Sequence, residues 1–592
     1  MDPKVREHDS PPEDSVGRVL SVRGSQAVIG IAEAAWNEPA EARMRVGAFV
    51  GIRGADRLVV GVVTATSVGS SSVAREQGFT LEVIVDLMGE IRSSGKADAR
   101  FGRGVTSYPA IGDHASALTR DALRAIFDVA GSDAIEIGRL QYDEGLPACI
   151  NVDDMLSRHF AILGSTGVGK SSGVAVVIGE VLARRPDLRV FLVDPHNEYG
   201  RCFGEQAQTL NPSNLKLPFW LFSFEEIVDV LFRGRPVDDE EREILAEIIP
   251  IARASYSAGN REAQERSIRK SESRQSFTVD TPVPYRLADV MALIDERMGR
   301  LETRVARGAY MRLLNRIDSI VADPRYAFMF ENANVGGDTM GRLLEQLFRL
   351  PAEGRPMTIM QLAGFPSEVV DAVVSVLARL AFDFGLWSDG RLPLLFVCEE
   401  AHRYAPADRS IGFGPTRRAI SKIAKEGRKY GVFLGLVTQR PAELDPTIVS
   451  QCSTLFVMRM SNERDQELVR SAVSDAAASL LAFLPTLGRR EVFAFGEGVA
   501  IPTRFIFKQL AQEHLPRSLA VADTAAELGR EVDHDFIEAV VERWRSATLS
   551  SRSRSESLEA PPAVQPATPP PTAELRRDHD RHGLLKKSTS RF

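Results

Sequence analysis

Short apolar runs separated by turns fill the first part of the chain. Glycine recurs at or near their joints, and the runs lie at residues 16–22, 27–31, 48–52 and 58–63. Such spacing is typical of a small β-barrel. We expect residues 79–85 and 134–140 to complete it. The pattern therefore predicts an N-terminal barrel domain over residues 15–150.

From His159 onward the pattern changes, and short apolar runs alternate with helical periodicity. These runs lie at residues 160–163, 190–193, 357–362, 394–397, 432–437 and 454–458. Strands that are apolar along their whole length and separated by helices indicate a mostly parallel sheet covered on both faces. We predict an α/β fold with a doubly wound core, in two parts at residues 151–218 and 356–512.

A long segment at residues 219–355 interrupts this core. Helical periodicity is clear at 240–254 and 287–315, whereas residues 255–284 are polar and are expected to form a loop. We expect the whole segment to be a helical bundle inserted in the core and packed on it.

Both ends of the chain differ in composition from the rest. Residues 1–14 are charged and contain proline, and residues 547–592 are rich in serine, proline and charge. Such segments bury too little apolar surface to offset the entropy of ordering, so we predict that both are disordered. Residues 513–546 are expected to form a C-terminal helical segment.

Composition and charge limit the classes of function. The formal net charge of −7 argues against a protein that coats nucleic acid by overall basicity, but a channel needs positive charge only along its inner wall. No run of roughly 18 apolar residues is present, and the N-terminus lacks the apolar core of a signal peptide. We therefore expect a cytoplasmic protein with no membrane segment. The four cysteines are widely spaced and are expected to be reduced packing residues.

The strongest chemical signal is GSTGVGKS at residues 164–171. It matches the P-loop pattern G-x-x-x-x-G-K-[ST], with an apolar strand before it and a helical stretch after it. Backbone N–H groups of such a loop cradle phosphate oxygens, aided by the positive end of the helix dipole. Lys170 is expected to reach the β- and γ-phosphates of ATP, and Ser171 to ligate Mg²⁺. The expected nucleotide-binding residues are Gly164, Ser165, Thr166, Gly167, Val168, Gly169, Lys170, Ser171 and Ser172.

A second signal is the apolar run 394–398, which ends in Glu399 and Glu400. This is the Walker B form. Glu399 stands where Asp is more common and would hold the hydration shell of Mg²⁺, and Glu400 would activate the attacking water. Two solvated acids at a strand end would give the same local pattern, but the preceding P-loop favours the catalytic interpretation.

Two further predicted strands end in polar residues. Gln439 follows one of them, and Asp194 and Glu198 follow the other. Ligands of doubly wound sheets lie outside the carboxyl ends of the strands. Gln439 is thus placed to sense the γ-phosphate or hold the water, and the two acids to lie near the nucleotide. Ordinary turn chemistry explains these residues as well.

A basic segment, KEGRKYG at residues 425–431, precedes the run at 432–437. A run of charge is usually a solvated face. A ring ATPase, however, needs an arginine that reaches a neighbouring active site, and Arg428 is the candidate. The loop at 403–418 could face a central pore or could be a flexible surface loop; in a pore, its DNA-contacting residues would be Arg409, Arg417 and Arg418.

Five blocks in a fixed order carry a family resemblance. They are the P-loop, DPHNEY at 194–199, EEAH at 399–402, EGRKYG at 426–431 and TQRP at 438–441. With the predicted barrel and helical insertion, residues 15 to about 510 resemble the HerA ATPases of the HerA–FtsK superfamily. Asn197 stands where the family often has Gly, a change we expect to matter little because Asn also adopts positive φ.

The resemblance implies a RecA-like P-loop ATPase core in a homohexamer that translocates double-stranded DNA, with ATP and Mg²⁺ as cofactors. It implies a partner, either a NurA-like nuclease in DNA end processing or a sirtuin-like or other nuclease effector in antiviral defence. It also implies that Glu400 is the catalytic base and that Arg428 acts in trans, with Arg158 as a second candidate for that role.

Two functions of different class remain open. In one, ATP hydrolysis drives DNA through the ring, in DNA repair or antiviral defence. In the other, the ring is an ATP-regulated scaffold that activates a partner nuclease or effector without processive translocation. A conjugation-type secretion ATPase is disfavoured by the predicted barrel and by the lack of a membrane segment.

Overall fold

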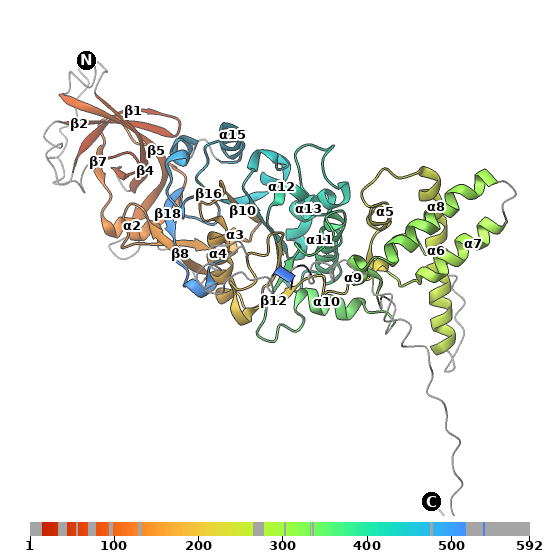
Figure 1. Ribbon diagram of the computed structural model, residues 1–592. Helices are drawn as coiled ribbons and strands as arrows, with labels where there is room; N and C mark the ends of the chain where they lie inside the picture. Colours follow the sequence, from red (N-terminus) through yellow and green to blue (C-terminus); the bar gives the residue numbers. More distant parts are fainter. Residues whose placement is uncertain are drawn as a thin grey trace, which may run out of the picture.

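The computed structural model describes residues 15–32, 44–54, 57–68, 78–93, 99–127, 133–264, 277–300, 304–331, 333, 337–473, 478–516, 537–538 and 541. A sheet core occupies the middle of an elongated molecule, with the barrel at one end and the helical insertion at the other (Figure 1). Within the described residues, no helix combines the length and apolar character needed to cross a membrane. The predicted disordered ends and most of the predicted helical segment 513–546 lie outside the described residues.

The N-terminal barrel has six strands whose hydrogen bonding closes on itself. They are β1 (Gly17–Arg23), β2 (Gln26–Ala32), β3 (Phe49–Arg53), β4 (Arg57–Val68), β5 (Phe79–Ser93) and β7 (His114–Ala117). The strand order β2-β1-β7-β3-β4-β5 returns to β2 through antiparallel pairing of β5 with β2. Buried valine and isoleucine side chains such as Val19, Ile29 and Val85 fill the interior. A further strand, β6 (Ala99–Arg103), pairs with β5 outside the closed ring.

Residues 134–140 do not complete the barrel, so this prediction is wrong. They form β8 (Ala134–Leu140), which pairs with β9 (Pro147–Asn151) and with β18 (Thr503–Phe507) in the large sheet. Like the barrel strands β1 and β3, β8 is a short antiparallel strand rich in apolar residues, so the local pattern could not separate it from them. In the sequence, helix α2 (Arg120–Phe127) separates the last barrel strand, β7, from β8. The core therefore begins before residue 150.

The core is a mixed sheet of eleven strands in the order β12-β13-β11-β14-β15-β10-β16-β17-β18-β8-β9. The first seven are parallel and include all six predicted core strands. Their bounds are β10 (His159–Leu163), β11 (Arg189–Asp194), β12 (Ala207–Leu210), β13 (Met357–Gln361), β14 (Leu394–Cys398), β15 (Val432–Thr438) and β16 (Cys452–Met458). The predicted parallel α/β core is confirmed, and β17 (Glu491–Gly496) begins an antiparallel extension that was not predicted.

Helices bury the parallel strands on both faces. Every residue of β10 and of β14 is buried, which accounts for their uninterrupted apolar sequences. The helices of the core are α3 (Val152–Met155), α4 (Lys170–Arg184), α11 (Val370–Trp387), α12 (Ala401–Tyr404), α13 (Gly414–Glu426), α14 (Pro446–Val449) and α15 (Glu463–Ala472).

Side chains tie the barrel to the core. Arg103 at the end of β6 reaches the turn between β17 and β18, where its Nη2 donates to the carbonyl oxygens of Gly496 (3.0 Å) and Glu497 (2.7 Å) and its Nε to that of Ala500 (3.0 Å). In β5, the buried carboxylate of Asp86 accepts a hydrogen bond from the Ser479 hydroxyl of the core. The barrel is thus fixed to the antiparallel end of the sheet.

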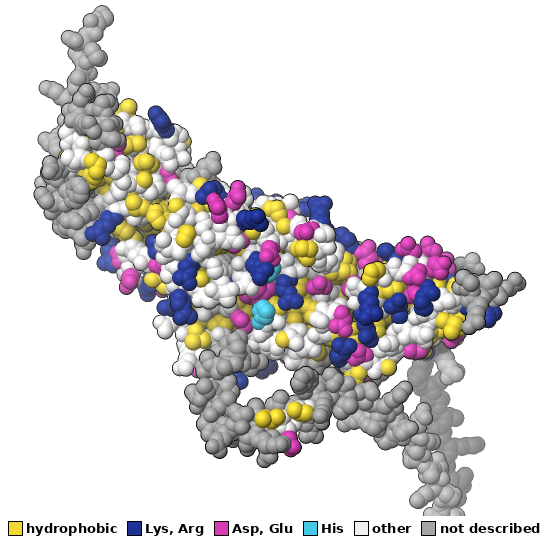
Figure 2. All heavy atoms as spheres, turned by 45° about the horizontal axis from the view of Figure 1, so that its top comes forward, with side chains coloured by type: hydrophobic (Ala, Val, Ile, Leu, Met, Phe, Trp, Pro, Cys, Tyr) yellow, Lys and Arg dark blue, Asp and Glu magenta, His cyan; other side chains and the backbone are white. Residues whose placement is uncertain are grey.

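The insertion is helical, as predicted. Its helices are α5 (Phe224–Phe232), α6 (Asp239–Gln264), α7 (Leu287–Gly299), α8 (Arg304–Val321), α9 (Ala327–Phe330) and α10 (Met340–Phe348). The expected loop at 255–284 is wrong in its first part, because α6 continues to Gln264. Ala252 and Tyr256 are both buried and extend the apolar face of α6 by one turn. Acidic and basic side chains are interspersed over this lobe on the face seen in Figure 2.

A buried carboxylate anchors the insertion to the core. Glu226 of α5 is 1% exposed and accepts hydrogen bonds from Ser375 Oγ (2.7 Å) and Arg379 Nη2 (2.8 Å) of α11. It also closes a capping box with Ser223 at the start of α5. This contact holds the insertion against α11, the helix that precedes β14 and the Glu399–Glu400 pair.

We predict that Glu226→Ala destabilises the protein by about 3–5 kcal/mol, because it leaves the Arg379 guanidinium without its buried partner. The matched control is Glu225→Ala. Glu225 is half exposed, and its surface pair with Arg418 is worth less than about 1 kcal/mol. Urea unfolding followed by circular dichroism measures both variants, and an equal loss in the two would contradict the anchoring role of Glu226.

Candidate functional site

The P-loop residues 164–169 join the end of β10 to the start of α4, at the carboxyl edge of the parallel strands. Gly169 precedes α4 with φ of +103°, a conformation that glycine adopts without strain. Lys170 is buried, and its Nζ donates to the carbonyl oxygen of Ser165 at 3.0 Å. Burial lowers the pKa of Lys170, and nearby carboxylates oppose this shift. The amine therefore lies folded over the loop and beside a group of acids.

Neighbouring strands hold the loop from both sides. Ser165 donates from its backbone N–H (3.0 Å) and from its hydroxyl (2.9 Å) to the carbonyl oxygen of Arg459, just after β16. On the other side, the Thr166 hydroxyl donates to Oε1 of Gln439, just after β15. Gln439 therefore lies directly across the P-loop, as its position at a strand end predicted.

Two acids at the site, Glu198 and Glu399, accept hydrogen bonds from hydroxyl groups. Ser171 Oγ donates to Glu198 Oε2 at 2.8 Å, and Tyr199 Oη donates to Glu399 Oε2 at 2.8 Å. Burial raises the pKa of Glu399 to about 8, although the hydrogen bond from Tyr199 favours its charged form. Strand ends far apart in the sequence thus place Glu198 and Glu399 around the start of α4.

Asp194 supports the turn after β11 rather than facing the loop. Its carboxylate oxygens accept from the backbone N–H groups of Glu198 (3.1 Å) and Tyr199 (3.0 Å). It is fully buried, and burial raises its pKa. Asn197 in the same turn has φ of +57°, the conformation expected for a position where the resembling family often has Gly. Of the two acids predicted here, Glu198 is the one that contacts Ser171.

Glu400 has a strained backbone and a buried side chain. Its φ of +51° is costly for a residue other than glycine, and such strain occurs mainly at functional sites. Its carboxylate oxygens lie 3.2 Å from His402 Nδ1 and 3.7 Å from His196 Nε2. His402 Nδ1 is also 2.9 Å from the hydroxyl of Thr438, the residue before Gln439. The turn after β14 is therefore linked to the end of β15.

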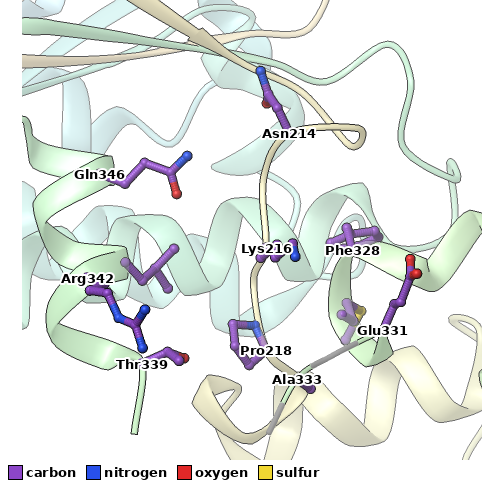
Figure 3. Close-up of a pocket in the computed structure, with 11 residues that line it drawn as sticks. Asn214, Lys216, Pro218, Phe328, Glu331, Ala333, Thr339, Arg342 and Gln346 are labelled. Carbon is purple, nitrogen blue, oxygen red and sulfur yellow. The ribbon is translucent and has the colours of Figure 1, made fainter. Parts of the chain in front are cut away.

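A separate cavity of about 500 Å³ lies away from these residues, where the insertion meets the core (Figure 3). Lys216 lies on the segment that follows β12, Glu331 lies just after α9, and Arg342 and Gln346 lie on α10. None of the P-loop or Walker B residues line this cavity.

Residues 135–381 match the family model of the central domain of helicase HerA. The chain is 26% identical over 439 residues to the DNA double-strand break repair helicase HerA of Pyrococcus furiosus, which covers 67% of this chain and 74% of that protein. It is 24% identical over 489 residues to HerA of Sulfurisphaera tokodaii, covering 78% and 88%. The chain is thus similar to the HerA helicases over about two thirds of its length or more.

Among solved structures, VirB4 of Thermoanaerobacter pseudethanolicus aligns with a TM-score of 0.44 and 15% identity, over 64% of this chain and 96% of that one. The segment 135–381 that matches the family model runs from β8 into α11. It includes the P-loop and the helical insertion, and the Glu399–Glu400 pair lies beyond it.

The two arginines predicted to act in trans lie far from the P-loop of the same chain. Arg158 immediately precedes β10, and Arg428 lies in the short 3-10 helix η5 (Gly427–Tyr430) that precedes β15. Both strands run toward the P-loop edge, so both arginines lie at the opposite edge, roughly 15 Å away or more. Both are exposed. Neither is placed to contact a nucleotide in its own subunit.

The predicted DNA-contacting loop joins α12 to α13. Residues 407–412 are exposed and include Arg409 together with Ile411, which is 61% exposed. Arg417 is half-buried, and Arg418 forms an ion pair with Glu225 of the insertion. Of the predicted three, Arg409 is therefore the one that lies within the exposed stretch 407–412.

Sequence reasoning assigned no role to Tyr199 or His402, although both lie inside the quoted motif blocks. Tyr199 binds Glu399, and His402 contacts both Glu400 and Thr438. Burial lowers the pKa of His402, opposed by the charge of Glu400. Their position within the motif blocks could have indicated a role. Their partners could not be predicted, because these lie at the ends of other strands.

His159 follows Arg158 and forms hydrogen bonds on both sides of Arg428 in the sequence. Its Nδ1 accepts from the backbone N–H of Leu434 (2.9 Å), so its protonated Nε2 donates to the carbonyl oxygen of Ala424 (2.9 Å). Burial lowers the pKa of His159 to about 4; the hydrogen bond to Ala424 opposes the shift, and the charges of Arg428 and Arg158 add to it. The ring is therefore neutral at physiological pH.

Protonation of His159 should destabilise the folded state. Its pKa is about 6.5 when unfolded and about 4 when folded, so its contribution is complete above pH 6.5 and is lost as the pH falls toward 4. Between pH 8 and pH 5, the wild type should lose about 2 kcal/mol more of its unfolding free energy than His159→Gln. His514→Gln, at a half-exposed ring, is the control. A parallel pH dependence in wild type and His159→Gln would refute the assignment.

Proposed function

We propose that this HerA-type ATPase is a homohexameric motor that couples MgATP hydrolysis to translocation of double-stranded DNA, together with a partner nuclease or effector. The observation that supports it most is the separation of P-loop and arginines onto opposite edges of one sheet. A site whose arginine lies at the far edge is completed by a neighbouring copy. The relatives named as DNA double-strand break repair helicases support the choice of DNA as substrate.

In this proposal, ATP lies with its phosphates on the backbone N–H groups of residues 164–169. Lys170 turns from the carbonyl of Ser165 toward the β- and γ-phosphates. Ser171, Glu198 and Glu399 supply oxygen atoms of the kind that Mg²⁺ prefers, and they surround the start of α4. Mg²⁺, when bound there, neutralises charge on the phosphate oxygens.

Glu400 is the proposed base. Its buried carboxylate accepts a proton from the water that attacks the γ-phosphorus, while the bond to the β–γ bridging oxygen breaks and ADP leaves. His402 and His196 each lie beside one of the two carboxylate oxygens. Gln439, held by Thr166 across the loop, is suited to orient the same water.

Arg428 and Arg158 would reach the γ-phosphate of the next subunit in the ring. An arginine supplied in trans stabilises the charge that develops in the transition state, typically by about 10³–10⁵ in rate. The loop that carries Arg409 would face the pore, where a few basic side chains suffice although the chain as a whole is acidic. The barrel is the proposed platform for the partner nuclease or effector.

We predict that Lys170→Ala abolishes ATP hydrolysis, and that Glu400→Gln binds ATP with near wild-type affinity yet hydrolyses it at least about 100-fold more slowly. Steady-state hydrolysis and nucleotide-binding assays test both. DNA movement should stop in Glu400→Gln, measured as displacement of a DNA-bound roadblock. Full partner activation by Glu400→Gln without such movement would instead favour the ATP-regulated scaffold.

Arg428→Ala should form rings and bind ATP but hydrolyse it about 10³-fold more slowly. Lys429→Ala, an exposed neighbour in η5, is the control and should stay near wild type. Mixing Arg428→Ala with Lys170→Ala should restore part of the activity, because some interfaces then pair an intact P-loop with an intact arginine. If mixed rings form and remain inactive, the assignment in trans fails.

A further inference from the structure

Arg490 lies beside the P-loop although it belongs to none of the sequence motifs. Its backbone N–H donates to the carbonyl oxygen of Val168 at 2.8 Å. A methyl group placed on Gly169 would come within 3.2 Å of Arg490 Cγ. The aliphatic part of the Arg490 side chain therefore runs along the last glycine before α4.

The turn that presents Arg490 is held firmly. Gly488 donates its N–H to Glu491 Oε2 at 2.5 Å, and Arg504 Nη2 binds the same oxygen at 3.0 Å. The carbonyl oxygen of Arg490 accepts from the backbone N–H of Phe507 at 3.1 Å. Arg490 itself has φ of +63°, a conformation that glycine would adopt without strain. The strained conformation directs a long cationic side chain to this place.

Among the residues that the structure describes, no protein group binds the Arg490 guanidinium. The neighbouring carboxylate of Glu491 is already occupied by Arg504 and Gly488. The side chain is half-buried. Its guanidinium therefore lies without a protein partner beside a loop of the kind that binds phosphates. Guanidinium groups bind phosphate oxygens through two parallel hydrogen bonds.

We propose that Arg490 binds the α- and β-phosphates of the nucleotide in the P-loop of its own subunit. The proposal rests on the ATPase function and adds a nucleotide-binding residue to it. Arg490 and the pair Arg158 and Arg428 lie at opposite edges of the sheet, so the same nucleotide is contacted by a cis arginine at its inner phosphates and by a trans arginine at its γ-phosphate. The inner phosphates carry similar charge before and during hydrolysis. Arg490 therefore contributes to binding and not to the chemical step.

The test compares Arg490→Gly with wild type. Glycine keeps the positive φ and the backbone hydrogen bond to Val168, and the side chain with its guanidinium is lost. The affinity for ADP, measured by titration calorimetry, should fall about tenfold or more. KM for ATP should rise by a similar factor while kcat stays within about twofold. Arg489→Gly removes the exposed neighbouring arginine and should leave all three values near wild type.

Arg490→Asn, a second residue type that tolerates positive φ, guards against a folding defect in the glycine variant. ADP binding within twofold of wild type in both variants would overturn the proposal. A fall in kcat at unchanged ADP affinity would overturn it as well, since it would place the guanidinium at the γ-phosphate. Loss of hydrolysis in Lys170→Ala beside normal binding in Arg490→Gly would refute the role of Arg490 alone and leave the ATPase assignment intact.

Discussion

The parallel pairing of β10 with β15 and β16 is the constraint on which the rest of the structure depends. Parallel strands place all their carboxyl ends at one edge and all their amino ends at the other. The P-loop, the Walker B acids and Gln439 meet because each follows one of these strands. The same pairing carries Arg158 and Arg428 to the far edge, since each precedes one. A single sheet thus has a phosphate-binding edge and a cationic edge, and the two cannot meet within one copy.

The parallel core was predicted well because strands buried on both faces have a distinctive sequence pattern. Uninterrupted apolar runs such as 160–163 and 394–397 admit few other interpretations when helices separate them. Strand β8 shows the limit of this reasoning. It is a short antiparallel strand like β1 and β3 of the barrel, and its pairing with β18, far along the chain, places it in the large sheet. The end of α6 was missed because the sequence of its last turns, residues 255–264, is largely polar.

The site was predictable to the extent that its residues sit at strand ends within recognisable motifs. Which acid contacts which partner was not, because those contacts join different strands. Glu198 rather than Asp194 meets Ser171 because the turn after β11 uses Asp194 to bind its own backbone. The strained conformation of Glu400 leaves no trace in the sequence. Arg490 could not be predicted for a further reason: it lies in the turn just before β17, an antiparallel strand that the sequence analysis did not predict.

The hairpin formed by β17 and β18 is attached to the rest of the molecule at both ends. At one end, the backbone of Arg490 is bonded to Val168 in the P-loop. At the other end, Arg103 of β6 donates hydrogen bonds to carbonyl groups of the turn at 496–500. Hydrogen-bonded antiparallel strands resist stretching and bending, so the hairpin is a stiff connection between its two attachment points. The hairpin therefore makes the position of the P-loop and the position of the barrel depend on each other.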